Sequence, residues 1–241
     1  MHPEYTVRES ARAKHVRFKV SIPDGLVVVI PLGFDRRRIP ELIDEKRGWI
    51  ERALRQVEVH REAMEMSDER PETIELTAIG RTWQLEWVDA VRSTIVADEI
   101  EPAVIRLSGP IDDPDMWCPV LRRWLVERGR EHLIPWAEQL AAELGVSYRR
   151  ISVRCQKTRW GSYSTKTGTV SLNAQLLFLP EHLARFVLLH ELCHVRHPDH
   201  SSAFWKLVSS YEPDVDRLRV DLRTAWRCVP FWVSRLRRGA A

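Results

Sequence analysis

The sequence lacks a long hydrophobic run. No apolar stretch approaches the roughly 18 residues that a membrane-spanning helix needs. The opening residues, MHPEYTVRES, also contain no apolar segment of the kind found in secretory signal peptides. These absences lead us to expect a cytoplasmic protein that does not contact a membrane.

Cysteine is scarce as well. The chain has four cysteines, and no two of them form a Cys-x-x-Cys pair. Such spacing argues against a disulfide framework and against a zinc site made of four cysteines. We therefore expect four reduced and mostly buried thiols, at Cys118, Cys155, Cys193 and Cys228.

The chain also has little net charge, only +3 at pH 7. Arginines nevertheless gather at residues 36–38 and in the terminal segment RLRRGAA. Such clusters are a weak indication of nucleic-acid binding, because basic residues on a solvated surface explain them more simply. Nucleic acid therefore remains a weakly supported partner, and the sequence does not indicate an oligomeric state.

What the sequence does contain is typical of a globular protein. Of its 241 residues, 44% are hydrophobic and 29% are charged, which is the balance of an ordinary folded domain. Ten tryptophans indicate a substantial aromatic core. The length suits one large domain or two small ones, and the chain shows no internal repeat.

Hydrophobic periodicity predicts a mixture of strands and helices. Alternating patterns over residues 16–31 and 72–109 predict strands, and apolar residues at helical spacing predict a helix over residues 39–57. A further strand is expected over residues 148–154, and a helix is expected to begin just after Pro180. This mixture predicts an α+β fold.

A long helical pattern in the middle of the chain suggests a division into two parts. It runs from residue 112 to 144, and we expect Gly129 and Pro135 to break it. We predict a β-rich N-terminal region with one helix over residues 1–110 and a second domain over residues 111–241. Packing between the two could unite them in one compact unit.

Residues 190–200 read HELCHVRHPDH and hold four of the nine histidines. On a helix, His190 and His194 lie one turn apart on the same face, so both imidazoles can reach a single zinc ion. Glu191 lies beside the first histidine, where its carboxylate can take a proton from a zinc-bound water. Polar groups on a buried helix need partners, and a metal explains them better than a hydrogen-bonded histidine pair does.

A zinc ion needs a third protein ligand, and His200 is the strongest candidate. His197 lies seven residues after His190, about 10 Å along a straight helix axis, and Pro198 disfavours helical geometry there. His200 lies beyond that turn, at the spacing that the metzincin peptidases use, although their glycine is His197 here. Glu212 is a more distant alternative.

Three segments carry a resemblance to a known family. QKTRWGSYS, VSLNAQLLFLP and HELCHVRHPDHSSAFWKLV are similar to the YgjP-like metallopeptidase family, which is also described as a domain of unknown function. The resemblance covers nearly the whole chain, including VRESARAKHVRFKV near its start. It implies a zincin-class hydrolase with one Zn²⁺ ion held by His190, His194 and His200, and with Glu191 as the catalytic residue.

Two residues depart from the family pattern. Tyr163 follows RWGS where the family usually has cysteine, and Ala174 follows an asparagine where it often has tryptophan. The Tyr163 phenol or the Arg159 guanidinium could donate a hydrogen bond to a developing oxyanion, with a structural role as the alternative for both. Asn173 could hold a substrate at a strand edge, or it could cap a turn.

These observations favour a zincin-like metallopeptidase domain that contains the HExxH helix and follows a β-rich N-terminal region. The predicted reaction is hydrolysis of a peptide or related amide bond in a peptide or protein substrate, with Glu191 as general base. One alternative is a DNA-associated module with a structural zinc site, and another is an inactive interaction scaffold. A structural site would normally use four protein ligands and would not need Glu191, so the residues favour catalysis.

Overall fold

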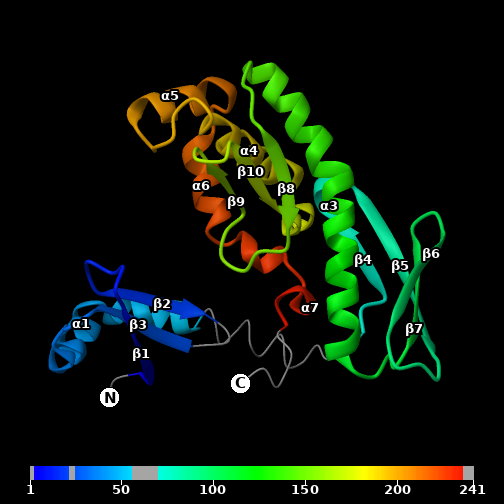
Figure 1. Ribbon diagram of the computed structural model, residues 1–241, viewed down its shortest axis with the longest axis horizontal. Coiled ribbons are helices and arrows are strands. Elements are labelled where there is room, and N and C mark those ends of the chain that lie inside the picture. The colour runs from blue at the N-terminus through cyan, green and yellow to red at the C-terminus, as the bar shows by residue number, and fades with distance from the viewer. Residues whose placement is uncertain (1–2, 22–24, 56–69, 236–241) are drawn as a thin grey trace. The chain divides into compact units, whose positions relative to one another are not determined.

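The computed structural model describes residues 3–21, 25–55 and 70–235 of the chain. Contacts divide the chain into an N-terminal unit, Met1–Glu69, and a C-terminal unit, Arg70–Ala241. Both units contain strands and helices, which confirms the predicted α+β class (Figure 1).

The N-terminal unit contains a three-stranded sheet of order β1-β3-β2 (Figure 1). Its strands are β1 (Tyr5–Ser10), β2 (Arg17–Ser21) and β3 (Gly25–Pro31). The central strand β3, GLVVVIP, is buried at its five middle positions because both of its faces are covered. Leu26, Val28 and Ile30 belong to one apolar cluster. Val27 and Val29, which point to the other face, pack with Ala13 in a second cluster. The strands predicted in this segment are confirmed.

A helical segment covers one face of this sheet. The 3₁₀ turn η1 (Arg36–Arg38) leads into α1 (Ile39–Glu45), and residues 47–55 are helical as well. Ile39, Ile43 and Ile50 join the cluster that contains alternate residues of β3, so they form the buried face of the helix. The predicted helix is thus confirmed from residue 39 onward, while residues 56–57 lie outside the described part of the chain.

The C-terminal unit begins with a four-stranded sheet of order β4-β5-β7-β6. Its strands are β4 (Thr73–Leu76), β5 (Arg81–Asp89), β6 (Val96–Glu101) and β7 (Val104–Gly109). The 3₁₀ turn η2 (Thr77–Ile79) and Gly80, with a φ of 60°, connect β4 to β5 as the predicted hairpin. Alternate side chains such as Ile74, Leu76 and Trp83 are buried, because one face of the sheet packs into the core.

One long helix, α3 (Pro114–Leu144), follows this sheet and is continuous over its whole length (Figure 1). The break expected at Gly129 and Pro135 does not occur. Gly129 instead permits close packing, since a Cβ there would lie 2.8 Å from a side-chain carbon of Val153. The glycine therefore marks a point where another segment crosses the helix, and the prediction of a helix break was wrong.

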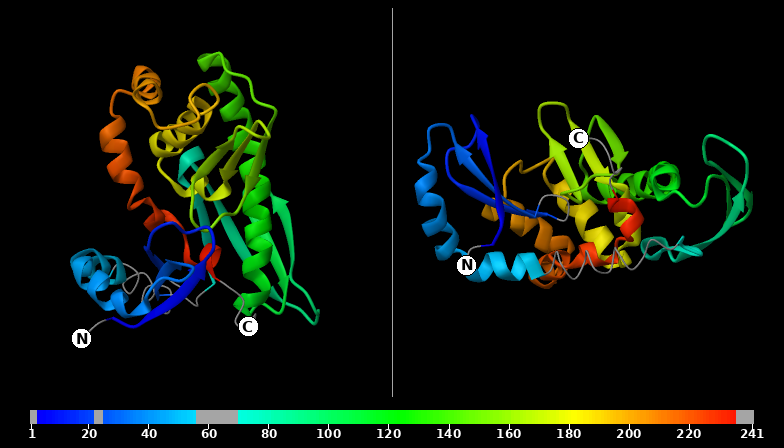
Figure 2. Two further views of the ribbon diagram at one scale, coloured as in Figure 1. Left: turned by 60° about the vertical axis from the view of Figure 1, so that its left-hand side comes forward. Right: turned by 90° about the horizontal axis from the view of Figure 1, so that it is seen from below.

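A third sheet, of order β8-β10-β9, places β9 at an edge. Its strands are β8 (Arg150–Arg154), β9 (Gly161–Ser164) and β10 (Thr169–Asn173). The chain then continues through helical elements, which are η3 (Ala174–Phe178), α4 (Glu181–Cys193), α5 (Ser202–Tyr211), α6 (Val215–Leu222), η4 (Ala225–Cys228) and α7 (Phe231–Ser234). Both views of Figure 2 show α4 beside this sheet, and α4 contacts both β9 and β10.

A single apolar core joins the elements of the C-terminal unit. Its buried members extend from Ile74 in β4 to Val233 in α7, and α4 contributes more of them than any other element of comparable length. The sheet of residues 73–109 shares this core, so the boundary predicted near residue 110 falls inside the C-terminal unit. Among the described helices, none is both long and apolar enough to cross a membrane.

Candidate metal centre

Helix α4 carries the first part of the site. It begins after Pro180, as predicted, and presents His190 and Glu191 from its last turn. His194 follows as the C-cap residue and keeps helical φ and ψ values of −64° and −17°. The i, i+4 spacing therefore brings the two imidazoles to one face, with ring centroids 4.9 Å apart.

The chain reverses direction after α4 and returns His200 to the same place. The Asp199 carboxylate accepts a hydrogen bond from the Ser201 backbone N–H at 3.3 Å, which stabilises the turn before α5. The Nε2 atoms of His200 and His190 lie 3.0 Å apart. One candidate ligand atom from each of His190, His194 and His200 lies within 4.8 Å of the other two. The three predicted ligands are thus brought together.

A hydrogen bond selects the nitrogen of His194 that can bind a metal. Its Nδ1 lies 3.0 Å from the backbone carbonyl oxygen of His197, and only an Nδ1–H can donate to that oxygen. The free lone pair is then on Nε2. His197 thus takes part through its backbone, while its side chain does not belong to the group of three histidines.

Burial favours the neutral imidazole at two of these histidines, His190 and His194. The pKa of His190 is lowered to about 3, first by burial and then by the neighbouring charges of His194, His200 and Arg219. Burial also lowers the pKa of His194. Neutral imidazoles offer lone pairs to a metal, and three of them form a donor set typical of zinc. The residues therefore fit a divalent metal ion of this kind.

Glu191 lies next to the histidines and is only 7% exposed. Burial raises its pKa to about 7, against the opposing effects of the Arg159 charge and of a hydrogen bond from the Tyr163 backbone N–H. Gly161 of β9 lies against the carboxylate, since a Cβ there would be 2.6 Å from Glu191 Cγ. The strand approaches this closely only because residue 161 has no side chain.

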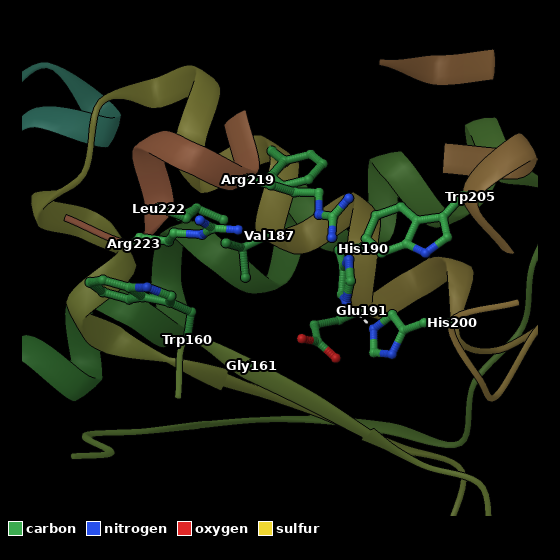
Figure 3. Close-up of a pocket in the computed structure, with 11 residues that line it drawn as sticks. Trp160, Gly161, Val187, His190, Glu191, His200, Trp205, Arg219, Leu222 and Arg223 are labelled. Carbon is green, nitrogen blue, oxygen red and sulfur yellow. Dashed lines mark hydrogen bonds between the residues drawn. The ribbon is translucent and has the colours of Figure 1, made fainter. Parts of the chain in front are cut away.

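A cavity of about 510 Å³ opens in front of these groups (Figure 3). Figure 3 shows the Glu191 carboxylate and the imidazoles of His190 and His200 close together at its wall. The lining residues are Trp160, Gly161, Phe186, Val187, His190, Glu191, His200, Trp205, Arg219, Leu222 and Arg223. They come from the segment that enters β9 and from α4, α5, α6 and their ends. The volume is typical of a site that receives a small ligand or a few side chains.

Tyr163 and Arg159 both act on Glu191, but by different means. Tyr163 lies on β9, where its half-buried side chain packs against the main core and its backbone N–H bonds to Glu191. The charge of Arg159 lowers the pKa of Glu191, although the Arg159 residue is exposed and does not line the cavity. A hydrogen bond from either side chain to an oxyanion stays a prediction.

Asn173 holds the loop that precedes β9. Its fully buried amide oxygen accepts hydrogen bonds from the backbone N–H groups of Gln156 and Gln175, at 3.2 and 3.1 Å. Its NH₂ group donates to the backbone carbonyls of Gln156 and Arg159, both at 2.9 Å. These four bonds use the whole hydrogen-bonding capacity of the amide. The geometry of Asn173 is therefore that of the capping alternative.

Two nearby groups with possible ligand atoms, Glu212 and Cys193, do not belong to the histidine cluster. Glu212, the distant alternative ligand, forms an ion pair with Arg185 at 3.5 Å. Cys193 is fully buried, and burial raises the pKa of its thiol to about 12, as expected of a packing residue. Cys118 is buried as well, Cys155 is half-buried, and Cys228 is exposed. The expected burial is therefore confirmed for two of the four cysteines, and their reduced state stays a prediction.

Sequence analysis did not identify several residues that line the cavity. Gly161 and Trp205 lie inside the segments that carry the family resemblance, so a signal for them was present. Arg219 and Arg223 lie in and just after α6, whose charged residues resemble those of any solvated helix. Only the packing of α6 near α4 reveals that these two arginines face the site.

Comparisons with known proteins add a family and two solved structures. The model of one family, described as YgjP-like, metallopeptidase domain, matches residues 14–225. The metallopeptidase zymogen of Methanocaldococcus jannaschii jannalysin is 22% identical, with a TM-score of 0.34, over 36% of this chain and 90% of that chain. The metallopeptidase zymogen of Pyrococcus abyssi abylysin is 27% identical, with a TM-score of 0.35, over 38% and 91%. No curated protein matches the chain significantly.

Proposed function

The chain belongs to the YgjP-like metallopeptidase domain family, and from this premise we propose that it is a zinc-dependent hydrolase of peptide or related amide bonds. One observation carries the proposal. His190, His194 and His200 converge within 4.8 Å, and two of them, His190 and His200, line one cavity together with the buried Glu191. A module that only binds a partner has no need of a buried carboxylate there, and burying one costs free energy.

The three imidazoles are the groups that would hold the metal. A zinc ion with three protein ligands supplies a Lewis acid and lowers the pKa of a bound water toward neutrality. His194 is oriented for this role by its bond to the His197 carbonyl, and His190 is neutral because burial lowers its pKa. Three ligands leave one position open, whereas a structural zinc site would normally be filled by four.

Glu191 is the proposed general base. With a pKa of about 7, its carboxylate can accept a proton at neutral pH and pass it to the leaving amine. The Arg159 charge and the Tyr163 backbone N–H both favour the ionised carboxylate, so they preserve the form that can act as a base. Gly161 leaves the carboxylate room to face the cavity.

The position of β9 favours an extended peptide as substrate. β9 pairs with β10 on one side and lies at the edge of its sheet. An edge strand can pair with the backbone of an added peptide, which is a common mode of peptide recognition. Because Gly161 on this strand touches Glu191, a peptide aligned there would present its bonds to the carboxylate.

An elemental analysis followed by digestion of an unbiased peptide library tests the proposal. We expect about one zinc ion per chain and cleavage products that mass spectrometry can detect. The Glu191→Gln variant should keep its zinc and lose activity by about 10²–10⁴-fold, because only the base is removed. Cleavage by that variant at the wild-type rate, or no cleavage by the zinc-loaded wild type, would refute the hydrolase. Salt-dependent DNA binding by a zinc-loaded but inactive protein would support the DNA-associated alternative.

A further inference from the structure

Helix α6 gives the cavity a cationic side. Arg219 and Arg223 both line the cavity, and they are four residues apart, so they project from one face of the helix. Figure 3 shows the Arg219 guanidinium beside His190 and Trp205, and the Arg223 guanidinium beside Val187. Two positive charges therefore border the space in front of the histidines.

These two charges have little compensation within the protein. Arg219 lies 3.3 Å from the Asp216 carboxylate, but the Asp216 side chain is 97% exposed, so solvent weakens this ion pair. The Arg223 guanidinium has no hydrogen-bond or ion-pair partner in the described part of the chain. Among the described residues, Glu191 is the one acidic residue that lines the cavity. Like charges one helical turn apart repel each other, and a bound anion would relieve that repulsion.

Trp205 fixes Arg219 relative to the histidines. The guanidinium carbon of Arg219 lies 4.3 Å from the centre of the Trp205 ring, in a cation–π contact. The same ring stacks on the imidazole of His200, with centroids 5.6 Å apart and an interplanar angle of 23°. Trp205 thus contacts a proposed metal ligand and a cation at once, so the distance from the histidine cluster to the positive charge is set by a rigid side chain.

The remaining lining of the cavity is mostly apolar. The apolar residues Phe186, Val187, Leu222 and Trp160 line the same cavity as the arginines and Glu191. Such a wall suits the aliphatic part of a side chain, and the planar forks of two guanidinium groups suit a carboxylate at its end. An acidic amino-acid residue of a peptide has both an aliphatic part and a terminal carboxylate.

We propose that Arg219 and Arg223 form a carboxylate-binding subsite, so that the protein prefers peptides with a carboxylate within a few residues of the bond presented to Glu191. This inference rests on the proposed hydrolase function, whose substrate class it narrows. The carboxylate comes from an aspartate or glutamate side chain, or from the C-terminus of the peptide chain. Both sources offer the same planar anion to the arginines.

A binding measurement separates the subsite from turnover. The full-length Glu191→Gln variant, incubated with zinc, is titrated calorimetrically with two amidated eight-residue peptides that differ only in a central glutamate or glutamine. The peptides of a second pair both have glutamine at this central position and end there. One of them has a free C-terminal carboxylate, and the other has a C-terminal amide. The side-chain source predicts a preference within the first pair, and the C-terminal source predicts one within the second.

Variants of α6 assign the preference to the two arginines. We expect the preferred carboxylate peptide to bind about tenfold more tightly than its neutral partner, since a charge-assisted hydrogen bond is lost without the carboxylate. The double variant Arg219→Gln/Arg223→Gln should abolish this difference. Arg217→Gln is the matched control, because Arg217 lies on the same helix, is 82% exposed and does not line this cavity. It should leave the difference unchanged.

Several results would overturn the subsite. The first is equal or undetectable binding of the charged and neutral peptides. The second is a carboxylate preference that survives in the double variant. The third is an equal loss of this preference in Arg217→Gln, which would mean that the net charge of the protein alone causes the preference. Tighter binding of a DNA oligonucleotide than of the carboxylate peptides, lost in the double variant, would assign the arginines to phosphate instead. Circular dichroism of each variant shows whether it is folded. The single variant Arg223→Gln should be folded and should lose only part of the preference for the carboxylate peptide, which separates a loss of binding from misfolding.

Cleavage by the wild type then distinguishes the two proposals. If the wild type cleaves nothing while the carboxylate preference holds and depends on Arg219 and Arg223, the hydrolase fails and the subsite stands. If the wild type cleaves library peptides without enrichment of acidic residues near the cut, the hydrolase stands and the subsite fails. Where both hold, acidic residues should be enriched near the cut by the wild type and by Arg217→Gln, but not by the double variant.

Discussion

Helix α4 and strand β9 meet at the Glu191 side chain and contribute different chemical groups to the site. α4 provides the glutamate itself and His190, both as side chains at the end of a core helix. β9 contributes backbone groups. The N–H of Tyr163 donates to the Glu191 carboxylate, and Gly161 lets the strand come close because it has no side chain. On the helix the identity of the side chains matters, whereas on the strand the position of the backbone matters.

Burial explains why the two elements differ. Most residues of α4 are buried, so its polar groups lie in a region of low dielectric where their pKa values shift strongly. All four residues of β9 are only half-buried, because the strand is at the edge of its sheet. A half-buried edge can accept a partner, while a buried helix can hold reactive groups at fixed positions.

The largest effect is expected where a side chain is removed from the histidine cluster. His200→Ala leaves two ligands, so zinc affinity should fall by more than about 100-fold, as measured by competition with a chelator. His197→Ala is the matched control, because His197 contributes its backbone carbonyl and keeps it in the variant. Equal zinc loss in the two variants would contradict the assignment of His200 as the third ligand.

On the strand, the strongest effect should come from adding a side chain. Gly161→Ala places a Cβ 2.6 Å from Glu191 Cγ, so the carboxylate or β9 must move. We expect kcat to fall by about 10–100-fold with zinc retained, since a shift of about 1 Å at a catalytic group has an effect of this size. Gly48→Ala makes the same change where the nearest atom is 3.6 Å away and should be silent. An unaltered kcat in Gly161→Ala would show that the contact is unimportant.

A smaller effect concerns the stability of the metal-free protein. The pKa of Glu191 rises from 4.5 to about 7 on folding, so the folded state keeps a proton that the unfolded state releases between these values. Stability conferred by this group therefore falls as pH rises from 4.5 to 7. Glu191→Gln should be more stable than the wild type by about 1–3 kcal/mol at pH 8. Urea unfolding should show that the gap closes near pH 4.5, and a gap independent of pH would contradict the burial argument.

The smallest effect is expected at the phenol of Tyr163. Its contact with Glu191 is made by the backbone, so Tyr163→Phe should change kcat by less than about threefold, well below the 10²–10³-fold loss of an oxyanion donor. Tyr163→Ala should lower the free energy of unfolding by about 1–2 kcal/mol, because the ring is only partly buried. A loss of 10²-fold or more in Tyr163→Phe, with zinc and stability intact, would restore the oxyanion role.

Local features of the molecule could be predicted from short patterns. The start of α4 after Pro180, its apolar pattern and the spacing of its histidines are all properties of a few adjacent residues. The exclusion of His197 followed from Pro198 and from helix geometry. The glycines were harder to interpret, because Gly129 was read as a helix breaker and is instead a packing contact.

By itself, the sequence determined that His190, Glu191 and His194 would lie together at the end of one helix, because backbone hydrogen bonds set the positions of residues up to four apart. Only the tertiary structure decided that Gly161 lies against Glu191 and that Arg219 and Arg223 border the same cavity. These residues are about 30 positions away along the chain on either side of the motif. Their approach depends on how β9, α5 and α6 pack around the buried face of α4, and no short sequence pattern encodes that packing.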